Sequence, residues 1–462
     1  MRQAVQHAML RCHAARLPGR ALLRLVWRRT GLKRWWAVRR FVRLQREWAQ
    51  ARLAPAAIAP AQGPVRILLI PPDPVLLVAS RGDQAMLLCL IRLCKASFDD
   101  PRFLVATAHN AAHRHAVEMG MKPCRVLDSG MPLVESVQRL LDERITHCIT
   151  VGADVFDGSD DPVFSGRLLM LTDLLAQAGV RSTVNGFSFS ADAYPGLAPI
   201  FERASRRVTY NLRDPVSYRR FVAFCAAPAA LTADIAFLLK PGPVNSRAVD
   251  NITDWVDQQH ALQRTVLGAN IHPLLLELDQ RGSLPKLVSA FAAAAARAVQ
   301  QCGVSIVLLE QDFRGPSSDS LCLNPLEAAL RAANCGAYLY RNSQPLSAQE
   351  LKQASSALDG VATGRMHLAV AALGSGVPVL AFGYKGKMEG LLEHFGLPGS
   401  LCIAGADLTD PDAYFSALKA LAQHGKRLAT QVQGKLPQVT HLARQNLRQF
   451  PDAPEREVPR VA

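Results

Sequence analysis

Residues 359–398, DGVATGRMHLAVAALGSGVPVLAFGYKGKMEGLLEHFGLP, contain the pattern that decides the fold. The apolar runs and their periods predict a strand at 360–363, a helix at 367–373, a strand at 377–382 and a helix at 387–394. A buried strand followed directly by a helix, twice in succession, is typical of a parallel sheet whose faces are covered by helices.

The same alternation extends along most of the chain, in two blocks. The first block predicts strands at 65–70, 75–79, 103–107, 145–151, 181–187 and 208–212, with helices at 84–95, 111–119, 167–178 and 214–224. The second predicts strands at 266–271, 304–309 and 337–340 and helices at 285–300, 324–333 and 347–356, followed by the stretch quoted above. Two such blocks, separated near 241–263, predict two Rossmann-like, doubly wound α/β domains with a ligand cleft between them.

We therefore divide the chain into four parts. They are a basic N-terminal arm with its linker (1–62), an N-terminal domain (63–245), a C-terminal domain (246–445) and a polar tail (446–462). The linker is the Ala/Pro-rich run LAPAAIAPAQGP at 53–64.

Composition excludes several classes of protein. The chain has 462 residues, of which 49% are hydrophobic and 20% charged, so it can bury a large core. Residues 1–54 contain fourteen Lys or Arg and one acid, Glu47, and this net charge of +13 leaves only +2 of the total of +15 for the rest. A nearly neutral body argues against nucleic-acid binding. Ten scattered cysteines without a CxxC pair indicate free thiols in a reducing compartment, and we expect no metal site.

The basic arm contains an amphipathic helical pattern at 35–51. On a helical wheel one face holds Trp35, Ala37, Val38, Phe41, Val42, Leu44, Trp48 and Ala51, and the opposite face holds Arg39, Arg40, Arg43, Arg46 and Glu47. This pattern suits a helix lying on an anionic membrane surface, and it equally suits a helix docked on its own domain or on a partner. No apolar run is long enough to cross a membrane, so we expect no membrane-spanning helix. The N-terminal pattern predicts no secretory signal, and a transit peptide is a further alternative.

The junction at 364–367 has the chemistry of an anion site. Arg365, Met366 and His367 lie where backbone N–H groups and the helix dipole favour a negative charge. Arg365 adds a planar cation, and His367 is suited to proton transfer near neutral pH. Tyr384 and Lys387 follow the next strand and are expected at the same rim. The alternative is an ordinary helix start with solvent-facing Arg and His.

These residues resemble the polysaccharide pyruvyl transferases, whose pattern is close to G-R-x-H, an apolar helix, G-V-P-V, Y-x-x-K and a helix ending in L-G-L. The matching positions are Gly364, Arg365, His367, Gly376-Val377-Pro378, Tyr384, Lys387 and Phe395-Gly396-Leu397. Weaker matches to the family pattern lie upstream, at Gly82-Asp83, at Arg213-Asp214 with Ser217, at Asp234 with Phe237, and at Asp312, Arg314 and Asp319. The resemblance covers roughly 65–440, and the chain departs from the family pattern at 151–154 and 185–188.

The resemblance implies a GT-B-like arrangement of the two domains. It also implies transfer of pyruvate from phosphoenolpyruvate to a sugar of a cell-surface polysaccharide or its lipid-linked precursor, giving a pyruvate ketal. The implied roles are catalysis by His367 and Arg365, donor binding by Arg213, Arg365, Met366 and Lys387, and acceptor binding by Arg81 and Asp83. Phosphoenolpyruvate is the donor substrate, and no cofactor is expected.

The resemblance implies phosphoenolpyruvate and a glycan or lipid-linked oligosaccharide as partners. The basic arm predicts an anionic membrane surface as a further partner through residues 1–54, and the nearly neutral body predicts no nucleic acid. The implied location is cytoplasmic and peripheral at the inner face of the plasma membrane. Two alternatives stay open: a nucleotide-sugar-dependent GT-B glycosyltransferase, which would use the same Arg and Lys on a diphosphate, and a non-catalytic, membrane-associated polysaccharide assembly protein.

Overall fold

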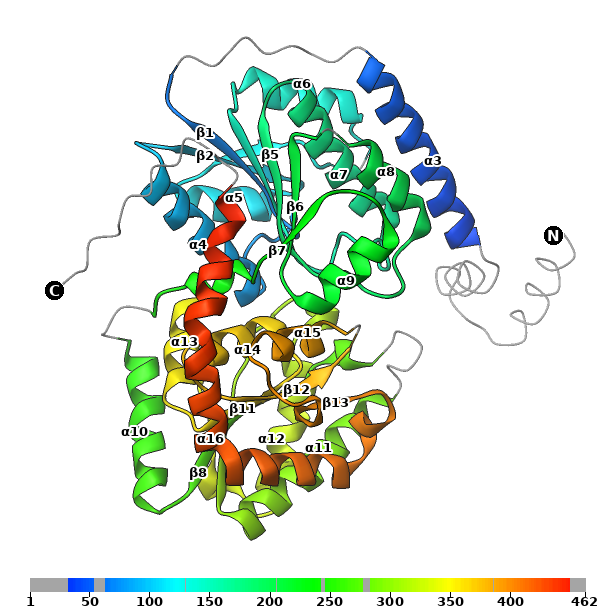
Figure 1. Cartoon of the computed structure of the whole chain (residues 1–462). Coiled ribbons are helices and arrows are strands. Elements are labelled where there is room, and N and C mark those ends of the chain that lie inside the picture. The colour runs from blue at the N-terminus through cyan, green and yellow to red at the C-terminus, as the bar shows by residue number, and fades with distance from the viewer. Residues whose placement is uncertain are drawn as a thin grey trace, which may run out of the picture.

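Two parallel sheets organise the molecule, one in each half of the chain (Figure 1). We analysed a computed structural model, which describes residues 32–53, 63–128, 130–204, 206–241, 246–276, 283–384 and 386–448. The first sheet has seven strands in the order β3-β2-β1-β4-β5-β6-β7, and the second has six in the order β10-β9-β8-β11-β12-β13. In both sheets the strand order reverses beside the first strand, so two doubly wound α/β domains are confirmed.

The first sheet is formed by β1 (Arg66–Ile70), β2 (Arg102–Thr107), β3 (Lys122–Arg125), β4 (His147–Val151), β5 (Arg181–Phe187), β6 (Val208–Leu212) and β7 (Ala229–Leu231). Its helices are α4 (Arg81–Ser97), α5 (Asn110–Glu118), α6 (Leu133–Asp142), α7 (Pro162–Gln177), α8 (Ala198–Arg203) and α9 (Pro215–Phe224), followed by the short 3-10 helix η2 (Ile235–Leu238).

The second sheet is formed by β8 (Thr265–Asn270), β9 (Val304–Leu308), β10 (Leu339–Arg341), β11 (Gly360–Thr363), β12 (Val379–Gly383) and β13 (Cys402–Ala404). Its helices are α10 (Arg247–Ala261), α11 (Leu284–Cys302), α12 (Ser320–Ala332), α13 (Ala348–Ser356), α14 (Met366–Leu373), α15 (Lys387–His394) and α16 (Pro411–Arg444).

The predicted elements agree with these except in a few places. Residues 75–79 form a turn instead of a strand, and the Leu77 backbone has a φ of +63°. Strands β3, β7 and β13 and helices α6, α8, α10 and α16 were not predicted. The three strands have only three or four residues each, and α6 follows a proline without a capping side chain. Helix α10 occupies most of the stretch at 241–263 that we predicted as the junction between the domains. Strand β4, by contrast, was predicted, and it is buried along its whole length although it contains His147 and Thr150.

Loops at the carboxyl ends of the two sheets meet across the boundary between the domains. Ser80, after β1, pairs with Asp312, after β9, in an antiparallel bridge. Its hydrogen bonds run from Arg81 N to Gln311 O (3.0 Å) and from Phe313 N to Ala79 O (3.2 Å). Because ligands of doubly wound domains bind at carboxyl ends of strands, this boundary is where a site is expected.

The C-terminal helix ties the two domains together. Helix α16 packs on α11 in the second domain and runs back to the first domain (Figure 1). Beyond its end, the Asn446 side chain donates to Ala233 O (2.8 Å), and Asn446 O accepts from the Asn211 side chain (3.1 Å). Asn446 and Leu447 are buried, so the polar tail that we predicted from residue 446 does not begin there.

The N-terminal helix α3 (Leu32–Leu53) is docked on the first domain, against α7 and α6 (Figure 1). Phe41, Leu44 and Trp48 are buried, and Trp48 Nε1 donates to Asp173 (2.8 Å). Glu47 accepts hydrogen bonds from the backbone N–H groups of Leu133 and Val134 at the start of α6. Phe41 and Trp48 therefore cover their own domain and are not available for insertion into lipid.

This corrects the interpretation in which the aromatic face enters a membrane. The side chain of Trp35 and residues 1–31 lie outside the described part of the chain. Among the described residues, no helix combines the length and the apolar character needed to span a bilayer.

Candidate active site between the two domains

His367 lies at the start of α14 and its ring packs against the first domain. A Cβ built on Gly82, in the first turn of α4, would come within 2.1 Å of His367 Nδ1. Only glycine allows the ring to approach α4 this closely. On its other side, His367 Nε2 lies 3.4 Å from Asp234 Oδ2, and it makes no hydrogen bond to the described residues. The second domain thus supplies a histidine whose immediate neighbours belong to the first.

Asp234 joins His367 to Arg213. Arg213 follows β6, is almost fully buried, and donates from Nη1 to Asp234 Oδ2 (2.9 Å) and from Nε to Ser188 Oγ (2.8 Å). Burial alone would raise the pKa of Asp234, but His367 and Arg213 outweigh burial and hold that pKa below its ordinary value. The buried carboxylate is therefore ionised and fixes both partners.

Asp83 is a second buried carboxyl beside His367. It lies in the first turn of α4, and its Oδ2 accepts no hydrogen bond from the described residues. Arg314 approaches it from the second domain, with Nη1 3.7 Å from Oδ2. Burial raises the pKa of Asp83 to about 6, against the opposing charges of Arg314 and His367. A carboxyl with this pKa can exchange a proton near neutral pH.

Arg365 is paired with acids of its own domain. Its Nε donates to Asp319 Oδ1 (2.8 Å), its Nη1 lies 3.1 Å from Asp312 Oδ2, and its Nη2 donates to the carbonyl of Ser317. Asp312 also accepts from Arg314, at 2.6 Å. Arg365 is buried, and its guanidinium holds the loop at 312–319 in place. It therefore does not point into the cleft as the free cation that the sequence predicted.

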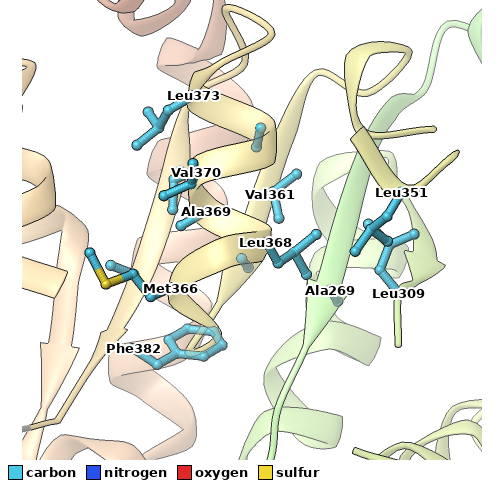
Figure 2. Packing of buried hydrophobic residues seen from close by; sticks show 14 of the residues in the cluster. Ala269, Leu309, Leu351, Val361, Met366, Leu368, Ala369, Val370, Leu373 and Phe382 are labelled. Atoms are coloured by element: carbon cyan, nitrogen blue, oxygen red, sulfur yellow. The ribbon is translucent and has the colours of Figure 1, made fainter. Parts of the chain in front are cut away.

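Met366 belongs to the core. Its side chain lies near Phe382 among the buried residues around α14 (Figure 2). Because the Met366 side chain is part of the core, only the backbone of Met366 can contact a ligand.

Arg81 is used at the contact between the domains. Its Nε donates to the carbonyl of Leu346 (2.6 Å), and its guanidinium lies 4.7 Å from the centre of the Phe313 ring. Burial lowers the pKa of Arg81, and Glu350 opposes that effect. Both Phe313 and Leu346 belong to the second domain. Of the two predicted acceptor residues, the structure therefore brings Asp83 to His367 and directs Arg81 to the loops of the second domain.

Lys387, at the start of α15, reaches across to the first domain. Its Nζ donates to Asp154 Oδ2 (2.6 Å) and lies 3.8 Å from the centre of the Tyr384 ring. Burial alone would lower the pKa of Lys387, but Asp154 and Tyr384 raise it above its ordinary value. Lys387 is therefore charged although it is nearly buried.

His272 is a residue that sequence reasoning missed. It follows β8 and is fully buried, with its ring 5.6 Å from that of Tyr384. Burial, reinforced by the charges of Arg365 and Lys387, keeps its pKa well below the ordinary value. The available signal was a polar residue directly after the strand at 265–270, where ligand-binding residues of such domains gather.

The residues thus form two groups along one boundary. His367, Asp234, Arg213 and Asp83 provide proton-transfer and charge chemistry, and Lys387, Tyr384 and His272 provide a cation beside a neutral ring. A small pocket next to His367 is lined by Arg81, Gln311, Lys352 and Leu351 among others. In the part of the chain that the structure describes, no group of His, Cys, Asp and Glu has the arrangement of a metal site.

Comparisons with solved structures support the fold. S. aureus MnaA in complex with UDP is 11% identical, with 82% of this chain and 94% of that chain covered and a TM-score of 0.53. The UDP-GlcNAc 2-epimerase from Neisseria meningitidis bound to UDP-GlcNAc is 9% identical, with 84% and 99% covered and a TM-score of 0.52. Another UDP-N-acetylglucosamine 2-epimerase is 12% identical, with 86% and 99% covered and a TM-score of 0.52. These likenesses show the GT-B-like fold and no more.

Among curated proteins, no match was found. A family model does match, over residues 81–386, and its description is polysaccharide pyruvyl transferase. That range includes Asp83, Arg213, Asp234 and His367, and it ends one residue before Lys387. Since the match covers more than half of the chain, this protein belongs to the polysaccharide pyruvyl transferase family of enzymes.

Proposed function

We propose that this enzyme transfers pyruvate from phosphoenolpyruvate to a sugar of a cell-surface polysaccharide or of its lipid-linked precursor, forming a pyruvate ketal. The observation that supports the proposal is the contact of the His367 ring with Gly82, the residue before Asp83, so that the imidazole of one domain acts on the Asp83 carboxyl of the other. Family membership supports the reaction type.

The proposed reaction balances without a cofactor. A proton adds to the methylene carbon of phosphoenolpyruvate, which leaves an oxocarbenium-like centre at the carbon that carries the phosphate. One sugar hydroxyl forms a bond to this carbon, the bond from the carbon to the phosphate oxygen breaks, and a second hydroxyl of the same sugar closes the ketal. Of the two hydroxyl protons, one replaces the proton used on the methylene and the other leaves with phosphate.

We assign the proton transfers to His367 and Asp83. His367 delivers the proton to the methylene carbon, and Asp234 positions its ring and stabilises the protonated form. Asp83, with its pKa raised by burial, accepts a proton from an acceptor hydroxyl. Because Gly82 and Asp234 cover the ring on two sides, the donor reaches His367 when the two domains separate.

The anionic groups of the donor are assigned to the cations nearby. We propose that the backbone N–H of Met366 holds the carboxylate and that Lys387 holds the phosphate. Arg213, which is buried and donates to Asp234 and Ser188, is proposed as a positioning residue for Asp234 and not as the free cation that the sequence predicted. Arg365 is proposed as a positioning residue, since it holds the loop at 312–319, which carries Arg314 to Asp83. Arg81 is proposed to favour the closed arrangement of the domains in which the acceptor is bound.

We further propose that the enzyme works in the cytoplasm and attaches to an anionic membrane surface through the basic arm. With the aromatic face of α3 buried, the attraction comes from charge alone. Arg40, Arg43 and Arg46 are exposed on the outer face of α3. Each basic residue near such a surface contributes on the order of 1 kcal/mol, and this attraction is screened by salt. Co-sedimentation with anionic vesicles that declines with salt supports the proposal, and binding that ignores salt contradicts it.

The function is tested with two labelled donors and one acceptor preparation. The purified enzyme is incubated with lipid-linked glycans and either phosphoenolpyruvate labelled in its carbon skeleton or a labelled nucleotide sugar. The proposal expects label from phosphoenolpyruvate in the glycan, with one phosphate released per pyruvate transferred, and both rates lower by about 10²-fold or more with His367→Gln. Transfer from the nucleotide sugar would instead establish the glycosyltransferase alternative, and transfer from neither donor would favour the assembly protein.

A further inference from the structure

Lys387 is a buried cation whose carboxylate partner comes from the other domain. Its side chain is 5% exposed, whereas that of Asp154 is 38% exposed. Lys387 is held at the start of α15 and against Tyr384, while Asp154 lies on the loop that follows β4. The cation is therefore the fixed partner and the carboxylate is the accessible one.

His272 adds a hydrogen-bond donor next to this cation. The backbone N–H of Leu274 donates to His272 Nδ1 (3.2 Å), so in the neutral ring the proton is on Nε2. His272 Nε2 is buried and faces the backbone of Gly364 so closely that a Cβ there would come within 2.6 Å. Gly364 acts on the pKa of His272 as a hydrogen-bond partner, but the contact lacks the geometry of a full hydrogen bond. A buried donor that is poorly paired costs free energy, and an anion nearby would relieve that cost.

We propose that Lys387, Tyr384 and His272 form a phosphate-binding site, here called the Lys387 anion site, and that the Asp154 carboxylate occupies it until a substrate phosphate displaces it. This inference rests on the proposed function, in which the phosphate is that of phosphoenolpyruvate. It adds a role for Asp154, which neutralises Lys387 between turnovers and competes with the donor.

The physical argument is that Lys387 needs a negative partner at every stage. A buried cation that loses its partner is strongly destabilising, whereas one that exchanges a carboxylate for a phosphate keeps its compensation. Because Asp154 and Lys387 belong to different domains, separation of the domains breaks their pair. The same movement exposes His367, so the anion site becomes free when the donor can enter.

The experiment uses inorganic phosphate as the probe and thermal unfolding as the readout. The increase in Tm on adding phosphate, relative to chloride at equal ionic strength, is measured for the full-length wild type, Asp154→Asn, Lys387→Met and Glu393→Gln. Glu393 is the matched control: it lies on the same helix as Lys387 and pairs with Arg219 across the same boundary, at 2.7 Å.

The proposal expects Asp154→Asn to have a lower Tm than the wild type in chloride and a larger increase in phosphate. Removing the competing carboxylate tightens phosphate binding, by about tenfold, and tighter binding to the folded state stabilises it further. In Lys387→Met, adding phosphate no longer increases Tm. In Glu393→Gln, the increase in Tm equals that of the wild type. Pyruvate, which offers a carboxylate without phosphate, produces no difference between the wild type and Asp154→Asn.

Two results would overturn the inference: an increase for Asp154→Asn no larger than that of the wild type, or an increase that survives in Lys387→Met. A second measurement guards against misfolded variants. The KM for phosphoenolpyruvate is expected to fall in Asp154→Asn, with the far-ultraviolet circular dichroism of the wild type. If neither the wild type nor any variant transfers pyruvate but the Tm increases in phosphate are as expected, the Lys387 anion site is supported and the proposed function is contradicted.

Discussion

The ring of His367 lies against the backbone of Gly82, so closely that a Cβ on Gly82 would come within 2.1 Å of Nδ1. Gly82 belongs to the first turn of α4 in the first domain, and His367 belongs to α14 in the second. The proposed active site is therefore assembled by the contact between the domains, and neither half of the chain contains it alone.

Gly82→Ala is expected to lower kcat by at least about tenfold, because the added methyl must displace the ring from its position beside Asp83, and small misplacements of catalytic groups are costly. Thermal unfolding should change less, since the clash is relieved by moving one side chain. Gly399→Ala is the control, because nothing lies within 4 Å of a Cβ at Gly399. Wild-type kcat in Gly82→Ala would show that the position of the ring does not matter.

His367→Gln is expected to lower kcat by about 10²-fold or more, the usual effect of losing a general acid–base group. Its Tm should fall by much less than its kcat, since Nε2 makes no close hydrogen bond to the described residues and lies 3.4 Å from Asp234, which keeps Arg213 as its partner. His113→Gln, at an exposed histidine, serves as the control. Turnover within a few-fold of the wild type would remove His367 from the mechanism.

Asp234→Asn is expected to lose about 3–5 kcal/mol of stability at neutral pH, because Arg213 would be left as a buried charge without a carboxylate. The folded-state pKa of Asp234 is below its ordinary value of 3.8, so its contribution is complete above that pH and is lost as pH falls below it. Urea unfolding should therefore show a constant difference from the wild type at pH 5 to 8, narrowing only in stronger acid. A difference in unfolding free energy between the two proteins that varies between pH 5 and 8 would contradict this prediction.

Asp83→Asn is expected to change how the stability of the folded protein depends on pH, in the sense opposite to that of Asp234→Asn. The folded-state pKa of Asp83 is raised from 3.8 to about 6, so the folded wild type binds the proton more tightly and loses stability as pH rises between these values. The loss amounts to roughly 3 kcal/mol at most. In Asp83→Asn this decline should be absent, and the acid limb of the kcat/KM profile should shift. Identical profiles for the two proteins would show that Asp83 does not titrate in this range.

Trp48→Ala is expected to destabilise the protein by about 3–5 kcal/mol, because the side chain is 4% exposed and its Nε1 donates to the buried Asp173. Deleting residues 1–53 should expose α7 and promote aggregation. Arg43→Gln, on the exposed face of α3, is the control. If Trp48→Ala unfolds like the wild type, the docking of α3 contributes nothing to stability.

The sequence by itself determined the fold class, because the periods of strands and helices are local. The stretch at 360–394 shows this: β11 (Gly360–Thr363) and α15 (Lys387–His394) have the predicted bounds, and α14 begins one residue earlier than expected. The motif around His367 also identified the family. Both results depend on residues that are neighbours in the chain.

Only the tertiary structure decided what each charged or aromatic side chain contacts. The amphipathic pattern of α3 is the same whether its apolar face meets lipid or protein, and the complementary surface on α7 is more than a hundred residues away. The pairing of Arg365 with Asp319, of Lys387 with Asp154 and of Arg213 with Asp234 likewise joins distant segments. The free energy of a buried charge depends on the partner that folding brings to it, and no local pattern contains that information.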